Sequence, residues 1–252
     1  MRLDKLLFDR GFAFSRERAQ AMVLAGRVLI DGQKVEKAGT QVAEDAEIRI
    51  LGDDPQFVSR GGVKLEHALK HWKIDITGKL CADIGTSTGG FTDCLLQHGA
   101  DMVICVDTGR GQIAEKLRRD SRVRLMEDTN ARKLIYNAFD IFVPNGRLNF
   151  ISMDVSFISA TLVLPAVITA AFGEEGQRCG EIVVLIKPQF EAGREYIGKG
   201  GIVKDEIAWQ SSVQRVAECV RGLGGKSLRT MESPIKGAEG NVEYLLHAVW
   251  KP

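Results

Sequence analysis

The chain has 252 residues, 44% hydrophobic and 27% charged, and its 34 basic residues nearly balance 33 acidic ones. This composition is typical of a globular protein with a buried core, and it excludes collagen-like and disordered chains. The most apolar stretch (158–172) is too short for a membrane helix, and the charged N-terminus is unlike a signal peptide, so no membrane association is expected. The five cysteines are scattered and form no C-x-x-C pair, which predicts reduced thiols in the cytoplasm and no metal site.

The first fifty residues predict two short helices followed by a hairpin. Leucines spaced by three and four favour a first helix that Gly11 ends, and Ser15 is a good N-cap for a second helix that ends at Gly26. Asp31 and Gly32 then separate two short apolar runs, which is a strong signal for a two-residue hairpin turn.

Charge is distributed unevenly over this segment. Residues 1–40 hold eight basic and five acidic side chains, whereas residues 41–55 hold five acidic and one basic. The change of sign, together with a proline, predicts a small domain at 1–54, a linker at 55–59 and a larger domain at 60–252.

The pattern R-L-D-x-x-L, S-R-x-x-A and G-x-V before the hairpin resembles the S4 RNA-binding domain, a small α+β domain, over most of residues 1–50. The resemblance implies that basic side chains contact RNA phosphates. A solvated helix face is the alternative for the same side chains. The candidates are Arg2, Lys5, Arg10, Arg16, Arg18, Arg27 and Lys34.

From residue 60 onward, apolar runs alternate with helical segments. Strands are predicted at 80–84, 102–106, 123–126, 148–154, 182–186, 226–232 and 242–250, and helices at 60–72, 91–98, 159–172 and 207–223. Repeated β-α units predict an α/β domain with a mostly parallel sheet, closed by an antiparallel last strand, and ligands at the carboxyl ends of its strands.

The first of these strands runs into a glycine-rich loop at 83–91. Its spacing is not G-x-G-x-x-G and no Lys-Ser/Thr follows, so neither a dinucleotide fingerprint nor a P-loop fits. The second strand ends at Asp107, whose carboxylate can accept both ribose hydroxyls of a nucleoside, and the third ends near Asp128. A plain turn with glycines for packing is the alternative.

Together these features resemble the S-adenosylmethionine pocket of Rossmann-like methyltransferases. The resemblance implies a seven-stranded sheet with S-adenosylmethionine as cofactor. The residues implied to bind it are Asp83, Gly85, Thr86, Ser87, Gly89, Gly90, Phe91, Asp107, Asp128 and Asp154.

Two later strands end in charged residues, Asp154 and Lys187, and a lysine is costly to bury at such a position without a role. The last strand opens at Glu243, and Lys64 lies in the segment S-R-G-G-V-K-L. The order Lys–Asp–Lys–Glu resembles the catalytic tetrad of FtsJ-type 2′-O-ribose RNA methyltransferases. Lys187 then either accepts the proton of the ribose 2′-hydroxyl or, as an ammonium, stabilises the alkoxide.

The phrases FVSRGGVKLEHAL, DIGTSTGGFTDCLL, MDVSFIS, LIKPQFE, GKGGIV and GNVEYLL resemble the haemolysin-like TlyA family over nearly the whole chain. The resemblance implies methylation of ribosomal RNA at a ribose 2′-hydroxyl, with cytidine in ribosomal subunits as the expected target. A membrane-active haemolysin and an RNA-binding protein without catalysis are the alternatives. The sequence leaves the modified nucleotide, the subunit and the oligomeric state open.

Overall fold

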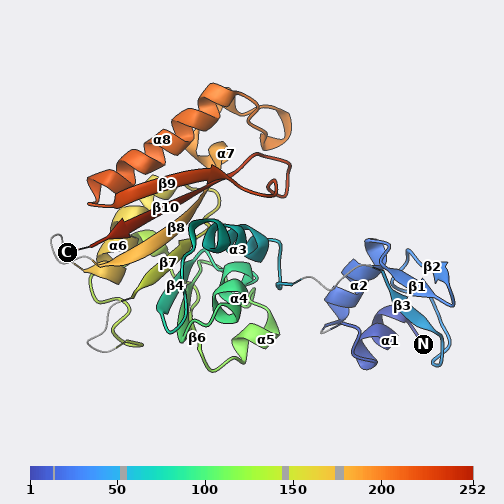
Figure 1. Cartoon of the computed structure of the whole chain (residues 1–252). Coiled ribbons are helices and arrows are strands. Elements are labelled where there is room, and N and C mark those ends of the chain that lie inside the picture. The colour runs from blue at the N-terminus through green and yellow to red at the C-terminus, as the bar shows by residue number, and fades with distance from the viewer. Residues whose placement is uncertain (14, 52–55, 144–147, 174–178, 252) are drawn as a thin grey trace. The chain divides into compact units, whose positions relative to one another are not determined.

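The computed structural model of the chain describes residues 1–13, 15–51, 56–143, 148–173 and 179–251. The chain divides into two compact units, Met1–Pro55 and Gln56–Pro252 (Figure 1). Within the described ranges, no helix is long and apolar enough to cross a membrane.

The N-terminal unit packs two helices against a three-stranded antiparallel sheet. Its elements are α1 (Leu3–Asp9), α2 (Arg16–Leu24), β1 (Val28–Ile30), β2 (Gln33–Lys34) and β3 (Ile48–Ile50), with the strand order β2-β1-β3. The Ser15 hydroxyl caps α2 by accepting a hydrogen bond from the Arg18 N–H. Asp31 and Gly32 have φ angles of 49° and 79°, as the predicted hairpin turn requires. The strand β3, which pairs with β1, was not predicted.

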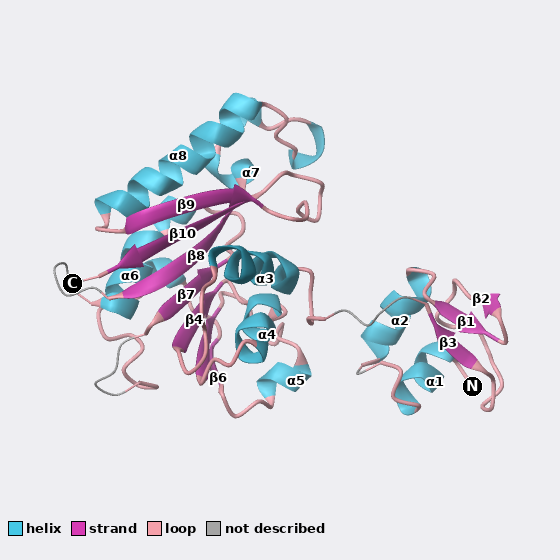
Figure 2. Ribbon diagram, in the orientation of Figure 1, coloured by secondary structure: helices cyan, strands magenta, loops and turns pink. Residues whose placement is uncertain are grey.

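The second unit is built on a seven-stranded sheet with the order β6-β5-β4-β7-β8-β10-β9 (Figure 2). The strands β4 to β8 are parallel, whereas β10 runs antiparallel to both of its neighbours, which confirms the predicted methyltransferase-like sheet. Their bounds are β4 (Leu80–Ile84), β5 (Met102–Val106), β6 (Val123–Met126), β7 (Phe150–Met153), β8 (Gly180–Ile186), β9 (Lys226–Glu232) and β10 (Tyr244–Trp250).

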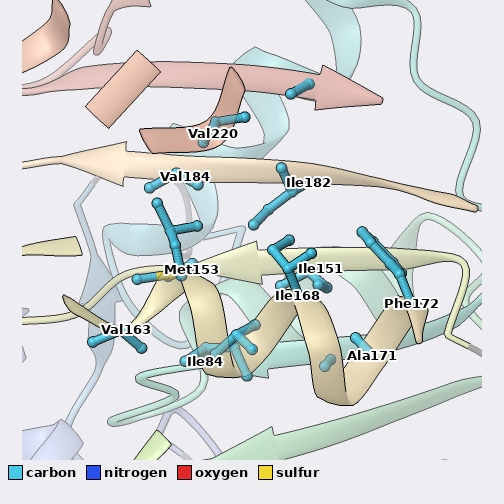
Figure 3. Packing of buried hydrophobic residues seen from close by; sticks show 14 of the residues in the cluster. Ile84, Ile151, Met153, Val163, Ile168, Ala171, Phe172, Ile182, Val184 and Val220 are labelled. Atoms are coloured by element: carbon cyan, nitrogen blue, oxygen red, sulfur yellow. The ribbon is translucent and has the colours of Figure 1, made fainter. Parts of the chain in front are cut away.

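Helices cover both faces of this sheet and give it two hydrophobic cores. One core joins the strands to α3 (Gly61–Trp72), α4 (Gly90–Gln97) and α5 (Glu115–Arg118). The other joins them to α6 (Leu164–Phe172) and α8 (Glu206–Gly222), where Ile168 and Phe172 pack near Ile151 of β7 (Figure 3). Short elements complete the unit: α7 (Pro188–Glu191), η1 (Ala131–Lys133), η2 (Ala160–Leu162), η3 (Arg194–Tyr196) and η4 (Lys199–Gly201).

The order of the strands determines where a ligand can bind. From β4 the chain proceeds outward to β5 and β6, and it then returns to β7 on the other side of β4. Loops that leave β4 and β7 in opposite directions open a crevice at the carboxyl ends of these strands. The glycine-rich loop, Asp107 and Asp154 all lie at this edge of the sheet.

Part of the predicted linker at 55–59 packs against the second unit. Pro55 lies outside the described residues, whereas Phe57 is buried in a core with residues of α3 and α4. The Val58 N–H also donates a hydrogen bond to the Asp93 carboxylate of α4. A single buried aromatic residue gives no sequence periodicity, so the pattern does not reveal this packing.

Candidate active site

The loop after β4 brings its backbone close to two neighbouring strands. Gly85 has a φ of 82°, and a Cβ at this residue would lie 2.3 Å from the carbonyl oxygen of Asp154. Only glycine permits this approach. At the end of β5, the two carboxylate oxygens of Asp107 accept hydrogen bonds of 2.7 Å from the N–H groups of Ser87 and Gly109. These bonds hold the Asp107 carboxylate at the edge of the sheet.

A cavity of about 470 Å³, the first cavity, opens where these strand ends meet. Four of the predicted cofactor-binding residues line it: Gly85, Ser87, Asp107 and Asp154. The full lining is Ile84, Gly85, Ser87, Val106, Asp107, Thr108, Gln112, Thr129, Asn130, Ala131, Asp154, Val155, Ser156, Phe157, Ile158 and Val163. Two carboxylates within a partly apolar lining suit a positively charged ligand with an apolar ring.

Asp83 is fully buried and does not line the first cavity. Its carboxylate accepts hydrogen bonds from the Thr92 N–H, the Thr92 hydroxyl and the Ser152 hydroxyl. Burial raises the pKa of Asp83 to about 7, and the negative charge of Asp154 acts in the same direction. Thr86, also buried, donates its hydroxyl proton to the Asp83 carbonyl oxygen. In this structure, Asp83 and Thr86 stabilise the glycine-rich loop through buried hydrogen bonds and do not contact the first cavity.

The remaining predicted cofactor-binding residues, Gly89, Gly90, Phe91 and Asp128, also lie outside the lining of the first cavity. Gly90 allows α4 to pack closely, since a Cβ there would lie 2.2 Å from the Ser59 hydroxyl oxygen. Phe91 is buried in the core. The Asp128 side chain is 65% exposed.

Five polar residues of the first cavity were not predicted from the sequence: Thr108, Gln112, Thr129, Asn130 and Ser156. Thr129 and Asn130 directly follow Asp128 at the end of β6, so the signal of a polar strand end had found the right segment. That signal does not say which of three consecutive polar side chains lines the cavity: Thr129 and Asn130 do, and Asp128, whose φ is 52°, does not.

A second cavity of about 390 Å³ adjoins the first. Ser156 and Phe157 line both cavities and form the wall that they share. The other residues of the second cavity are Lys187, Gln189, Phe190, Ile197, Gly201, Ala238, Glu239 and Glu243. Two predicted catalytic residues, Lys187 and Glu243, therefore face a space that adjoins the predicted cofactor site.

The four predicted catalytic residues form two ion pairs. Lys187 Nζ lies 2.5 Å from Asp154 Oδ1, and Lys64 on α3 pairs with Glu243. The side chains of Lys64 and Glu243 are almost fully buried. Because Ile186 of β8 pairs with Tyr244 of β10, the next residues along these strands, Lys187 and Glu243, lie opposite each other.

Two further side chains beside Lys187 were not predicted. Lys187 Nζ donates a 2.7 Å hydrogen bond to the Ser156 hydroxyl oxygen. Phe157 has a φ of 64° and is 92% exposed, and its ring centroid lies 5.3 Å from that of Phe190. The positions of both depend on the loop after β7, whose path carries no periodic signal. An exposed phenylalanine beside two cavities indicates a surface for an apolar ligand group.

In the N-terminal unit, two of the predicted RNA-binding residues surround a buried carboxylate. Asp4 is fully buried and accepts hydrogen bonds from Arg2, Arg16 and Gln20. The Arg2 guanidinium, above all, holds the pKa of Asp4 well below its usual range. Reversing the charge of Arg16 would therefore disturb folding as well as any contact with RNA.

The other predicted RNA-binding residues also have partners within the unit. Arg10 and Arg27 donate to the carbonyl oxygens of Ala46 and Leu51. Lys5 pairs with Asp9, Lys34 lies 3.6 Å from Glu36, and Arg18 is half-buried. The side chains of Arg2, Lys5, Arg16 and Lys34 nevertheless remain 49–53% exposed. Their exposed atoms can therefore contact an RNA phosphate while the contacts within the unit are kept.

Comparisons with known proteins agree with this architecture. Residues 57–250 match the model of the FtsJ-like methyltransferases, and residues 1–48 match that of the S4 domain. The chain is 42% identical over 246 residues to the 16S/23S rRNA (cytidine-2′-O)-methyltransferase TlyA of Mycobacterium tuberculosis, covering 97% of this chain and 88% of that protein. It is 40% identical over 249 residues to Hemolysin A of Brachyspira hyodysenteriae, covering 99% and 100% of the two chains.

A solved structure of a candidate hemolysin from Streptococcus thermophilus is also similar. It is 39% identical, with a TM-score of 0.71, over 99% of this chain and 88% of that one. The matches extend over both units of the chain, and the identity of its full-length relatives lies well above what a shared fold alone produces. The chain therefore belongs to the FtsJ-like methyltransferase family, within the group of S4-containing proteins that includes TlyA.

Proposed function

We propose that this protein transfers the methyl group of S-adenosylmethionine to the 2′-hydroxyl of a cytidine in ribosomal RNA, with ribosomal subunits as its substrate. The observation that carries the proposal is the pair of adjoining cavities, with the Lys187–Asp154 ion pair at their junction and Glu243 lining the second cavity. The M. tuberculosis relative carries this activity in its name, which supports cytidine and ribosomal RNA as the target.

The first cavity fits S-adenosylmethionine in size and in charge. Its volume of about 470 Å³ lies in the range of small-molecule sites. The Asp107 oxygens, each held by one backbone N–H, keep lone pairs free to accept hydrogen bonds from ribose hydroxyls. Asp154 adds a second carboxylate near the expected position of the sulfonium. When bound, the cofactor supplies a methyl group on a positively charged sulfur.

Asp107→Ala is expected to weaken S-adenosylmethionine binding by roughly 10- to 150-fold, because a hydrogen bond to a charged group contributes about 1.5–3 kcal/mol. Asp128→Ala is the matched control, since its carboxylate lies outside the cavity lining and should leave the affinity unchanged. Titration calorimetry on both variants measures the difference. If the two variants bind S-adenosylmethionine with equal affinity, Asp107 does not bind the cofactor and has only a structural role.

The second cavity suits the ribose that receives the methyl group. The 2′-hydroxyl is a weak acid and must lose its proton as its oxygen attacks. A neutral Lys187 amine accepts this proton, or a Lys187 ammonium stabilises the alkoxide while the proton leaves to solvent. Both roles need the nitrogen to face the hydroxyl, and Asp154 holds it at 2.5 Å. Glu243, which is paired with Lys64, lies opposite Lys187 where β8 ends and β10 begins. In this proposal the Lys64–Glu243 pair positions the ribose for in-line attack.

Phe157 offers its exposed ring to the base of the target nucleotide. Phe157→Ala is expected to lower kcat/KM for ribosomal subunits by roughly 5- to 150-fold, because stacking of a base on an aromatic side chain contributes about 1–3 kcal/mol. Phe157→Tyr should retain most of the activity, since it keeps the ring. Methyl transfer at several subunit concentrations measures the effect, and wild-type kcat/KM in Phe157→Ala would show that the ring is not used.

Two alternatives remain from the sequence. An RNA-binding protein without catalysis is not favoured, because the Lys187–Asp154 and Lys64–Glu243 pairs are both formed beside a cavity of suitable size. A membrane-active haemolysin has no specific observation in its favour beyond the name of the Brachyspira relative. Incubation of the purified protein with labelled S-adenosylmethionine and ribosomal subunits tests the proposal: label should enter the RNA, and unlabelled RNA would contradict it.

A further inference from the structure

The amine of Lys187 has two partners, and only one of them belongs to the tetrad. Besides the Asp154 carboxylate at 2.5 Å, Nζ donates a hydrogen bond of 2.7 Å to the Ser156 hydroxyl oxygen. Asp154 and Ser156 are two residues apart on the loop that leaves β7, whereas Lys187 follows β8. Ser156 also lines both cavities, so its hydroxyl lies at the junction where methyl transfer would occur.

The two contacts of the amine differ in what they fix. The contact with Asp154 is an ion pair, and among the described residues Asp154 Oδ1 accepts no hydrogen bond. A lysine nitrogen has three directions besides its bond to Cε: three N–H bonds in the ammonium, or two N–H bonds and a lone pair in the amine. The hydrogen bond to Ser156 occupies one of them and so fixes rotation about the Cε–Nζ bond, which leaves another direction for a ligand in the second cavity, which Lys187 lines.

We propose that Ser156 is a positioning residue for Lys187 that fixes the free direction of its nitrogen towards the ribose 2′-hydroxyl. The proposal rests on the function proposed above. It holds for either role of the lysine, because a lone pair that accepts a proton and an N–H that stabilises an alkoxide must point to the same oxygen.

The loop that carries Ser156 has a separate anchor. The buried Glu191 carboxylate accepts hydrogen bonds of 2.6 Å from the Ser159 hydroxyl and the Ala160 N–H. Removing the Ser156 hydroxyl leaves both bonds in place, so Ser156→Ala should not displace the loop. Ser159→Ala removes one of them and is a matched control for loosening of the same loop.

The charged groups around the amine come from several elements. Asp154 follows β7, while Glu239 and Glu243 lie before β10 and line the second cavity together with Lys187. Lys64 on α3 is paired with Glu243. Both Ser156→Ala and Ser156→Thr leave all of these charges unchanged. If the pH dependence of kcat changes in Ser156→Ala but not in Ser156→Thr, the change must therefore come from the loss of the hydroxyl.

The test compares Ser156→Ala, Ser156→Thr and Ser159→Ala in the full-length protein with labelled S-adenosylmethionine and ribosomal subunits. Ser156→Ala is expected to lower kcat by about 10- to 100-fold, with the dissociation constant of S-adenosylmethionine within about threefold of wild type. The kcat–pH profile of Ser156→Ala should also differ from that of wild type, because the reacting amine has lost a hydrogen-bond acceptor. Ser156→Thr, which retains the hydroxyl, should keep both the kcat and the pH profile of wild type.

Three outcomes would overturn a claim, and they are distinguishable. Wild-type kcat and pH profile in Ser156→Ala would overturn the role of Ser156 alone. An equal loss of kcat with the same change of pH profile in Ser159→Ala would assign the effect to the loop and would also overturn the role of Ser156. If wild-type protein itself transfers no methyl group to ribosomal RNA, the proposed function fails, and the role of Ser156 fails with it.

Discussion

Lys187→Ala is expected to lower methyl transfer to ribosomal subunits by about 10²- to 10⁴-fold, the range in which a positioned proton-transfer group contributes. S-adenosylmethionine affinity should change by no more than a few-fold, because Lys187 lines the second cavity and not the first. Single-turnover transfer of labelled methyl measures the rate, and calorimetry measures the affinity. The separation of the two effects is the signature of a group that acts on the acceptor.

Two variants support the interpretation of that result. Lys187→Met retains the apolar stem of the side chain and should be as inactive as the alanine variant. Lys226→Ala removes an exposed lysine at the start of β9 and should behave as wild type. Turnover within about threefold of wild type in Lys187→Met would exclude the lysine from the chemistry and would contradict the proposed mechanism.

Removal of the N-terminal unit is expected to leave a folded protein that binds S-adenosylmethionine but does not methylate ribosomal subunits. A chain that begins at Gln56 keeps Phe57 in its core and keeps the bond between the Val58 N–H and Asp93. It loses the half-exposed basic side chains of the first unit, and phosphate contacts supply much of the affinity of proteins for nucleic acids. The methylation rate at limiting subunit concentration should fall by about 10²-fold or more.

Salt dependence provides the control for this truncation. The affinity of the full-length protein for RNA should fall steeply as salt rises, with a log–log slope of about one per phosphate contact, whereas the truncated protein should show a shallower slope. Lys5 and Lys34 are better sites for charge reversal than Arg16, because their side chains pair with Asp9 and Glu36 and not with the buried Asp4. If the truncated protein methylates subunits as well as the full chain does, the first unit is not the docking element.

Much of the catalytic unit could be predicted from the sequence because parallel strands place their carboxyl ends at one edge. Apolar runs that end in Asp107, Asp154 and Lys187 predict that these side chains converge, and the structure brings all three to that edge. The ion pairing could not be derived in this way. Lys64 and Glu243 are 179 positions apart, and only the antiparallel register of β8 and β10 brings Glu243 opposite Lys187.

The features that the sequence did not predict depend on loop conformation or on isolated contacts. Ser156 and Phe157 line both cavities because of the path of the loop after β7, which no periodicity describes. Asp128 satisfies the pattern of an acidic strand end, yet the residues that line the first cavity there are its neighbours Thr129 and Asn130. The strand β3 was missed because three residues in an acidic segment are too few to alternate visibly.

The most direct test of the account is to identify the methylated atom. Purified protein is incubated with labelled S-adenosylmethionine and ribosomal subunits, and the RNA is then digested to nucleosides and, in parallel, cleaved with alkali. Labelled 2′-O-methylcytidine and a labelled, alkali-resistant linkage are expected, because a methylated 2′-oxygen cannot attack the adjacent phosphate. Label on a base, or label released by alkali as an ordinary mononucleotide, would contradict the role assigned to the Lys64, Asp154, Lys187 and Glu243 constellation.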